Sequence, residues 1–203
     1  MAEDLLLLAR GGEQALGLDL SPQPLEPLVA QSLQVLRSRA KRAGVSLVVD
    51  GDSTVESTVD SFRFRQVMEN LVENAIVHAT GSPFVEVSLD HGDQFAVIEV
   101  KDLGPGFPPD FLPRAFDRFS RGMASRPRSE GGAGLGLPIV RMLVESQGGT
   151  VEIANRPEKG AVVTVRLPLS PQMVPRSSTL TNTEPEIGNG REIEIAEGKM
   201  WSL

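Results

Sequence analysis

The chain has 203 residues, of which 40% are hydrophobic and 23% are charged, and its formal net charge at pH 7 is -7. This composition is typical of a soluble globular protein with one ordinary domain plus extensions, and the acidic balance argues against general nucleic-acid binding. No apolar run approaches the ~20 residues of a membrane span, and the absence of cysteine and the presence of only two histidines disfavour disulfides and transition-metal sites.

In the N-terminal quarter of the chain, the sequence pattern predicts two helical segments and two short strands. Residues 2–10 (AEDLLLLAR) have the apolar face of a helix end and are followed by Gly11 and Gly12. A helix this short is marginal alone, so we expect it to have packed on something missing from this chain. The next predictions are a short strand at 18–20, a helix at 25–43 with a basic C-terminal end, and a strand at 45–49.

The rest of the body is predicted to combine helices with antiparallel strands. Asp60 is a favoured N-cap for a helix running to about His78. The following predictions are strands at 84–89 and 95–100 with a turn at 91–93, a turn at 104–109, a short helix at 112–119, a mobile loop at 120–134, a helix at 135–147, and a strand pair at 150–154 and 161–167. Residues 170–203 show no sustained period and are predicted to be mostly disordered. The body is therefore one α+β domain with an antiparallel-rich sheet and helices on one face.

The predicted helix at 60–78 carries the first candidate site residues. Asn70 and Asn74, four residues apart, stack on the border of its apolar face, whereas Glu69 and Glu73 fall further toward solvent. Two amides can offer oxygens to a hard cation and NH₂ groups to phosphate oxygens. The alternative is two ordinary polar residues at a helix edge.

A second candidate lies where the strand at 95–100 ends. Asp102 can hold out a carboxylate that only accepts hydrogen bonds, which suits the exocyclic amine of a purine. Gly104 and Gly106 would let the backbone pass close to a flat ring. The alternative is an ordinary turn, and a strand-end carboxylate is not expected to pack in the core.

The third candidate is the glycine-rich stretch 130–140 (EGGAGLGLPIV). No lysine follows the glycines as in a P-loop, and Leu137 stands where a dinucleotide fingerprint needs its third glycine. What remains is G-x-G-x-G leading into a helix, whose N-terminal N–H groups suit an anionic phosphate. The alternative is a flexible connector.

In order and spacing, these blocks resemble the catalytic ATP-binding domain of sensor histidine kinases, in the superfamily of gyrase, mismatch-repair ATPases and some chaperones. The N, G1, F and G2 boxes of that family are matched by Asn70-x-x-x-Asn74-Ala75, Asp102-x-Gly104-x-Gly106, Phe116-x-x-Phe119 and Gly132-x-Gly134-x-Gly136-Leu137. The resemblance implies a two-layer α/β sandwich of the Bergerat type, with a mixed, mostly antiparallel sheet. It divides the chain into the end of a dimerisation and phosphoacceptor helix (1–12), the ATP-binding domain (18–169) and the tail (170–203).

The resemblance also implies the cofactors ATP and Mg²⁺ and a role for each matched residue. Asn74 would bind Mg²⁺, Asn70 would lie near the phosphates, and Asp102 would accept from the adenine amino group. The remaining residues implied to contact the nucleotide are Gly104, Gly106, Phe119, Gly132, Gly134, Leu135 and Gly136. The loop from Phe119 to Gly132 would be the ATP lid, and Asn70 and Arg121 are the candidates for a catalytic role.

Within the superfamily, residue 70 favours phosphate transfer over hydrolysis. Hydrolysing members carry a glutamate there to activate water, and an amide cannot act as a general base at neutral pH. Two residues differ from the usual histidine kinase pattern. Val77 stands where many members have Lys or Arg, and Ala133 stands where a hydroxyl residue is usual. Arginines of the lid could compensate for the missing cation: Arg118, Arg121, Arg126 and Arg128.

The implied activity is that of the catalytic part of a protein-histidine kinase in a two-component system. Neither His78 nor His91 has the neighbours expected of a phosphoacceptor. The acceptor would therefore lie on a separate dimerisation domain, of the same or another kinase, with a response regulator downstream. The fragment is expected in the cytoplasm without nucleic-acid or membrane contact, and a membrane anchor in a missing N-terminal region is left open. The alternatives are a degenerate nucleotide-binding or regulatory module without transfer, and a gyrase-type ATPase, against which Asn70 argues.

Overall fold

The computed structural model describes residues 16–78, 82–120, 134–171 and 173. The helix expected at 2–10, most of the loop expected at 120–134 and nearly all of the tail lie outside the described residues. The proposed domain boundaries at 12, 18 and 169 stay predictions.

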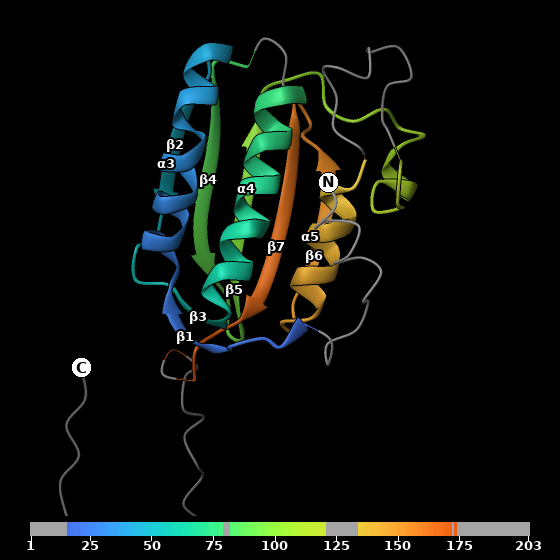
Figure 1. The fold of residues 1–203 in the computed structure, drawn as a ribbon. Helices are drawn as coiled ribbons and strands as arrows, with labels where there is room; N and C mark the ends of the chain where they lie inside the picture. Colours follow the sequence, from blue (N-terminus) through green and yellow to red (C-terminus); the bar gives the residue numbers. More distant parts are fainter. Residues whose placement is uncertain (1–15, 79–81, 121–133, 172, 174–203) are drawn as a thin grey trace, which may run out of the picture.

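The centre of the fold is a five-stranded mixed sheet in the order β2-β4-β5-β7-β6 (Figure 1). Its strands are β2 (Ser46–Gly51), β4 (Phe84–His91), β5 (Phe95–Asp102), β6 (Thr150–Asn155) and β7 (Ala161–Pro168). Only the β2–β4 pair is parallel, so the sheet is mostly antiparallel, as predicted. A second sheet of two antiparallel strands, β1 (Ser21–Pro24) and β3 (Glu56–Val59), lies at one end.

In the described part of the chain, three helices cover one face of the large sheet, which makes the predicted two-layer sandwich (Figure 1). They are α3 (Leu25–Ala43), α4 (Ser61–His78) and α5 (Gly136–Glu145). The Asp60 carboxylate accepts hydrogen bonds from the N–H groups of Phe62 (2.9 Å) and Arg63 (3.0 Å), which confirms it as the N-cap of α4. None of the described helices is both long and apolar enough to cross a membrane.

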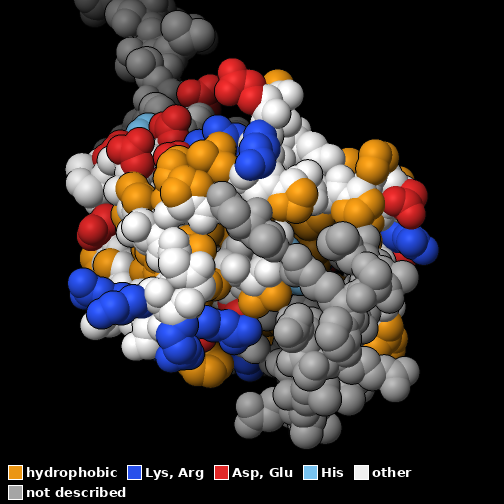
Figure 2. Space-filling model, turned by 90° about the horizontal axis from the view of Figure 1, so that it is seen from above, with side chains coloured by type: hydrophobic (Ala, Val, Ile, Leu, Met, Phe, Trp, Pro, Cys, Tyr) orange, Lys and Arg blue, Asp and Glu red, His pale blue; other side chains and the backbone are white. Residues whose placement is uncertain are grey.

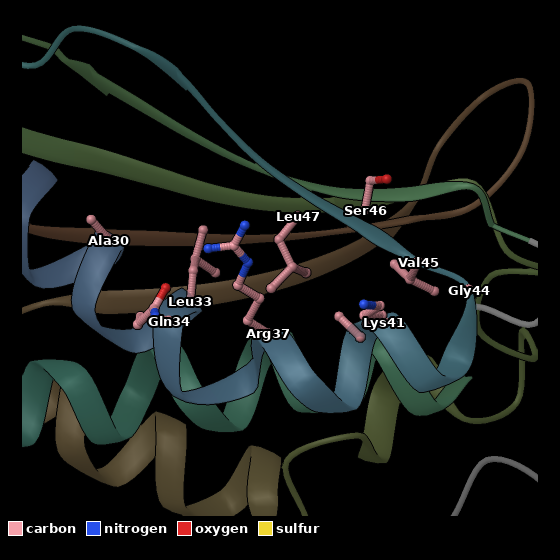
Figure 3. A pocket seen from close by; sticks show the side chains of 10 residues that line it. Ala30, Leu33, Gln34, Arg37, Lys41, Gly44, Val45, Ser46 and Leu47 are labelled. Atoms are coloured by element: carbon pink, nitrogen blue, oxygen red, sulfur yellow. The ribbon is translucent and has the colours of Figure 1, made fainter.

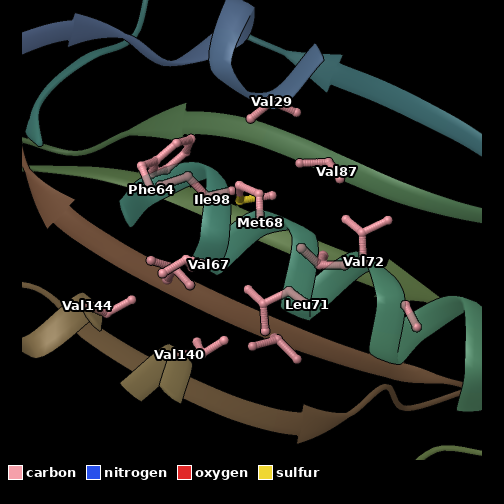
Figure 4. Close-up of a cluster of buried hydrophobic side chains, with 14 of the residues drawn as sticks. Val29, Phe64, Val67, Met68, Leu71, Val72, Val87, Ile98, Val140 and Val144 are labelled. Carbon is pink, nitrogen blue, oxygen red and sulfur yellow. The ribbon is translucent and has the colours of Figure 1, made fainter. Parts of the chain in front are cut away.

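The apolar face of α4 lies at the centre of the hydrophobic core (Figure 4). Its side chains pack between the sheet and the two flanking helices, as the helical spacing of the apolar residues predicted. The residues labelled there are Phe64, Val67, Met68, Leu71 and Val72 of α4, Val29 of α3, Val140 and Val144 of α5, and Val87 and Ile98 of the sheet. This packing places the polar border of α4, with Asn70 and Asn74, beside α5.

Two predicted elements are wrong. The strand predicted at 18–20 does not form, and β1 is instead Ser21–Pro24, whose prolines fit a strand that pairs on one side only. Its partner β3 was not predicted because four residues of mixed polarity give no clear alternation. The helix predicted at 112–119 is only one 3₁₀ turn, Leu112–Arg114, and Phe119 has a positive φ of 64°, which is incompatible with a continuing helix.

Candidate functional site

The beginning of α5 lies against the asparagine pair of α4. A Cβ atom on Gly136 would be 3.3 Å from Asn74 Nδ2 and 3.4 Å from Asn70 Oδ1. Asn70 Nδ2 donates to the Gln66 carbonyl at 2.8 Å, which leaves Asn70 Oδ1 on the side of α5. The first N–H groups of α5 have no acceptor within the helix. Two side-chain amides and a helix N-terminus, separated by more than sixty residues in the chain, therefore share one small space.

Asp102 ends β5 with its side chain largely buried, which corrects the expectation that it is not packed in the core. Only 8% of the residue is exposed, and its Oδ1 accepts from the Gly104 N–H at 2.7 Å. Burial raises the pKa of the Asp102 carboxyl above its ordinary value, and the N–H groups of Gly104 and Ala161 and the nearby charges of Arg156 and His78 oppose that rise. Asp102 is thus an acceptor in a dry environment, where a hydrogen bond is strong.

The turn that follows Asp102 is held by residues far away in the sequence. The Asn155 side chain accepts from the Phe107 N–H at 2.7 Å and donates to the Phe107 carbonyl at 2.8 Å. Gly106 has a φ of 75°, and a Cβ there would lie 2.7 Å from Asn155 Oδ1. The Ser82 hydroxyl accepts from the Leu103 N–H at 3.0 Å. Residues 103–107 therefore have a fixed conformation rather than that of an ordinary surface turn.

The turn between β6 and β7 packs directly on the backbone of Asp102. Arg156 Nη1 donates to the Asp102 carbonyl oxygen at 3.1 Å, and a Cβ on Gly160 would lie 1.9 Å from that same oxygen. Sequence reasoning missed Ser82, Asn155, Arg156 and Gly160. A strand-end asparagine and a hairpin glycine are visible in the sequence, but their partners depend on the β5-β7-β6 register.

The two described ends of the glycine-rich loop meet next to α5. The Phe119 N–H donates to the Gly134 carbonyl at 3.0 Å, and Gly134 has a φ of 71° that suits glycine. A Cβ on Gly134 would also lie 2.8 Å from the Ser120 carbonyl oxygen. The Phe119 side chain is 64% exposed, whereas the Leu135 side chain is buried in the core. Gly132 and Arg121 lie outside the described residues, so their predicted roles are untested.

The sequence predicted that Glu73 faces away from the apolar core, which the structure confirms, and that His91 lies in a turn, whereas it is the last residue of β4. Glu73 forms an ion pair with Arg39 of α3, so it is directed away from α5. His78 is exposed at the end of α4 and interacts electrostatically with Asp102. His91 lies at the end of β4, with Nε2 3.7 Å from the Asp52 carboxylate. Among the described carboxylates of this site, Asp102 is the one whose pKa is raised.

Residues 59–171, more than half of the chain, match the sequence profile of the family described as "Histidine kinase-, DNA gyrase B-, and HSP90-like ATPase". The signal transduction histidine-protein kinase AfsQ2 of Streptomyces coelicolor is 46% identical over 123 residues, which are 61% of this chain and 22% of that protein. The sensor protein SrrB of Staphylococcus aureus is 29% identical over 168 residues, which are 83% of this chain and 29% of that protein. The chain thus spans less than a third of the length of these relatives.

Solved structures give the same assignment. Full-length ShkA, solved in complex with AMPPNP, has a TM-score of 0.70 at 28% identity over 83% of this chain and 35% of its own. The mycobacterial sensor histidine kinase MprB has a TM-score of 0.63 at 28% identity over 75% of this chain and 99% of its own. The histidine kinase AdeS of Acinetobacter baumannii, at 23% identity and a TM-score of 0.69 over 83% of this chain and 77% of its own, shares the fold. This chain is therefore a member of the histidine kinase-, DNA gyrase B- and HSP90-like ATPase family.

Proposed function

We propose that this chain is the ATP-binding catalytic part of a sensor histidine kinase, and that it transfers the γ-phosphate of ATP to a histidine on a separate dimerisation domain. The observation that carries the proposal is the position of Gly136, at the beginning of α5, beside the side chains of Asn70 and Asn74. It joins a helix N-terminus, which suits phosphate, with amide oxygens, which suit a hard cation.

The adenine side of the site is formed by Asp102 and the turn after it. The carboxylate accepts from the purine amino group, and Gly104 and Gly106 line the ring. The hydrogen bonds of Phe107 with Asn155 support this assignment, because they hold the turn in one conformation before any ligand binds. Phe119, Leu135 and the glycines at 132, 134 and 136 bind the rest of the nucleotide through the lid, with Arg121 near the phosphates.

The donor set at the asparagine pair fits Mg²⁺ bound together with a nucleotide. No group of three or more His, Asp or Glu side chains that could hold a metal occurs among the described residues. A Mg²⁺ site with one amide oxygen, phosphate oxygens and water is nevertheless typical of nucleotide enzymes. Asn74 would hold the ion, which supplies charge neutralisation at the phosphate oxygens when bound.

Transfer is favoured over hydrolysis by the residues around Asn70. An amide cannot deprotonate water at neutral pH, and Glu73 is engaged by Arg39 on the other side of α4. Phosphoryl transfer to an external histidine needs positioning and charge neutralisation above all. The histidine belongs to a dimerisation domain of the same or another kinase, and the phosphate passes on to a response regulator in the cytoplasm.

The test uses the whole chain and an added acceptor domain. Calorimetry should show ATP binding that depends on Mg²⁺, and γ-labelled ATP should leave the chain alone unlabelled. Addition of a matching dimerisation domain should give acid-labile label, and the same domain without its histidine should give none. Label on the isolated chain, or steady phosphate release, would contradict the proposal, and binding without transfer would select the degenerate module.

A further inference from the structure

The end of α5 and the beginning of α4 are linked by one buried side chain, that of Gln147. Gln147 lies just after the end of α5, and only 3% of it is exposed. Its Oε1 accepts from the N–H of Asp60, the residue before α4, at 2.9 Å, and its Nε2 donates to the Leu143 carbonyl oxygen of α5 at 2.8 Å. Because an unpaired polar group is costly in a buried place, this amide favours one position of the two helix ends relative to each other.

Asp60 provides a fixed point for this link. One oxygen of its carboxylate caps α4, the other accepts from the Asp19 N–H at 3.0 Å, and its carbonyl oxygen accepts from the Phe64 N–H at 2.8 Å. Asp19 belongs to the segment that leads into β1, and Figure 1 shows this segment passing below the beginning of α4. The position of Asp60 is therefore set by α4 and by this segment, independently of α5.

The other end of α5 lies at the asparagine pair, with little free space. The space is tight because a Cβ atom on Gly136 would lie only 3.3 Å from Asn74 Nδ2 and 3.4 Å from Asn70 Oδ1. α5 has ten residues, so it is roughly 15 Å long, and its buried side chains pack beside α4 (Figure 4). A packed helix of this length transmits a displacement of one end to the other. A shift of α5 at Gln147 would therefore change the space between Gly136 and the asparagines.

We propose that Gln147 is a positioning residue for the phosphate side of the nucleotide site. By linking the end of α5 to Asp60, it sets the position of Gly136 relative to the asparagine pair. The inference rests on the proposed function, since it concerns the place where the phosphates of ATP bind. The adenine side does not depend on this link, because the turn after Asp102 is held by Ser82 and Asn155 instead. A change at Gln147 should therefore weaken the binding of the phosphates and leave that of adenine unaltered.

Calorimetry of the full chain with ATP and Mg²⁺, and separately with adenosine, tests the proposal. Gln147→Met keeps the length of the side chain but offers no oxygen to the Asp60 N–H. Its affinity for ATP should fall by roughly three- to tenfold, bounded by the net contribution of one hydrogen bond, and its affinity for adenosine should stay the same. Gln147→Glu keeps an oxygen for the Asp60 N–H. It should therefore retain the wild-type ratio of the two affinities, although its buried charge lowers stability.

Two control variants lie in a groove of about 650 Å³ between α3 and β2 (Figure 3). The groove is at the β2 edge of the large sheet, whereas α5 packs against β6 at the other edge. Leu33→Ala removes buried apolar contacts there, so it should lower stability in urea unfolding without changing either affinity. In the view from above, Lys and Arg side chains gather on the left near the end of α3 (Figure 2). Lys41→Gln therefore controls for a general attraction of ATP to these cations, and it should also leave both affinities unchanged.

A second measurement needs no nucleotide. The Ile139 N–H donates to the Leu135 carbonyl oxygen at the beginning of α5, so in Gln147→Met its hydrogen exchange, followed by NMR, should be several-fold faster than in the wild type. If Gln147→Met does not fold, Gln147→Asn is the milder variant, because its shorter amide reaches Asp60 only when α5 moves, and the same changes are expected of it.

Four outcomes would overturn the positioning role. These are an unchanged affinity of Gln147→Met for ATP, an equal fall in its affinities for ATP and adenosine, the same loss in Leu33→Ala, and an unchanged exchange rate of the Ile139 N–H. Each of them leaves the proposed function intact as long as the wild type binds ATP. A wild type that binds neither ATP nor adenosine would instead contradict the proposed function, and the positioning role with it.

Discussion

The substitution Asp102→Asn separates the chemistry of the adenine site from its packing. An asparagine is nearly isosteric, and its amide oxygen can keep the 2.7 Å hydrogen bond from the Gly104 N–H. The substitution replaces the second carboxylate oxygen with an NH₂ group, so a purine amine meets a donor instead of an acceptor. Asp102→Ala is a poorer test, because it leaves the buried Gly104 N–H without an acceptor, at about 1–3 kcal/mol of stability.

A lost hydrogen bond to a charged acceptor is worth about 1.5–3 kcal/mol, so we expect ATP to bind about 10- to 150-fold more weakly. Inosine triphosphate has a carbonyl in place of the amine, so its affinity should fall little or rise. Calorimetry with both nucleotides measures the difference. Asp93→Asn, exposed in the turn before β5, is the control and should leave both affinities unchanged.

The same substitution should also change how the free energy of unfolding depends on pH. Because burial raises the folded-state pKa of Asp102 above its ordinary value of 3.8, the folded state binds more protons in that window, and stability falls as pH rises through it. Asp102→Asn removes this titrating group, so the free energy of unfolding in urea should depend less on pH in that window in the variant than in the wild type. Wild-type affinity for ATP in the variant would refute the adenine assignment, and an unchanged pH dependence of the free energy of unfolding would refute the burial argument.

Four other substitutions test the rest of the site. Asn74→Ala should abolish the Mg²⁺ dependence of ATP binding in calorimetry, and an unchanged dependence would exclude it as the ligand. Gly134→Ala should lower unfolding free energy by about 1–3 kcal/mol because of its positive φ and the nearby Ser120 carbonyl, whereas Gly136→Ala should leave urea unfolding nearly unchanged and weaken ATP binding. Asn155→Ala should reduce stability by about 1 kcal/mol and weaken ATP binding; unaltered affinity would mean that the turn does not need this support.

The local patterns predicted the large elements and the pieces of the site. The spacing of apolar residues gave α3 and α4 within a residue of their observed ends, and it placed Asn70 and Asn74 on the correct border of α4. Their contact with Gly136 could not follow from spacing alone, because it depends on how α5 packs against α4. The asparagine pair and the glycine-rich stretch were expected to share one site only because of the resemblance to the histidine kinase family.

Long-range backbone contacts could not be predicted. The hydrogen bonds between Asn155 and Phe107 join residues 48 positions apart, and nothing in either local sequence specifies the other. The short strands β1 and β3 were missed or misplaced for a related reason: four residues carry little periodic information, and their pairing stabilises them. The burial of Asp102 likewise follows from the neighbouring strands and the β6–β7 turn rather than from its place in β5.

The packing of Gly160 and Arg156 on the Asp102 carbonyl has a consequence for how substitutions distribute along the chain. A side chain at position 160 has no room, since a Cβ would lie 1.9 Å from that oxygen, and its φ of 95° is unfavourable for any other residue. In a saturation mutagenesis experiment selected for ATP binding, this short hairpin turn should therefore tolerate change as poorly as the ligand-facing positions, although it is close to Asp102 only through the backbone. When the tolerated substitutions are plotted on the structure, the β6–β7 turn should therefore be as intolerant as the nucleotide site, although the ligand does not contact this turn.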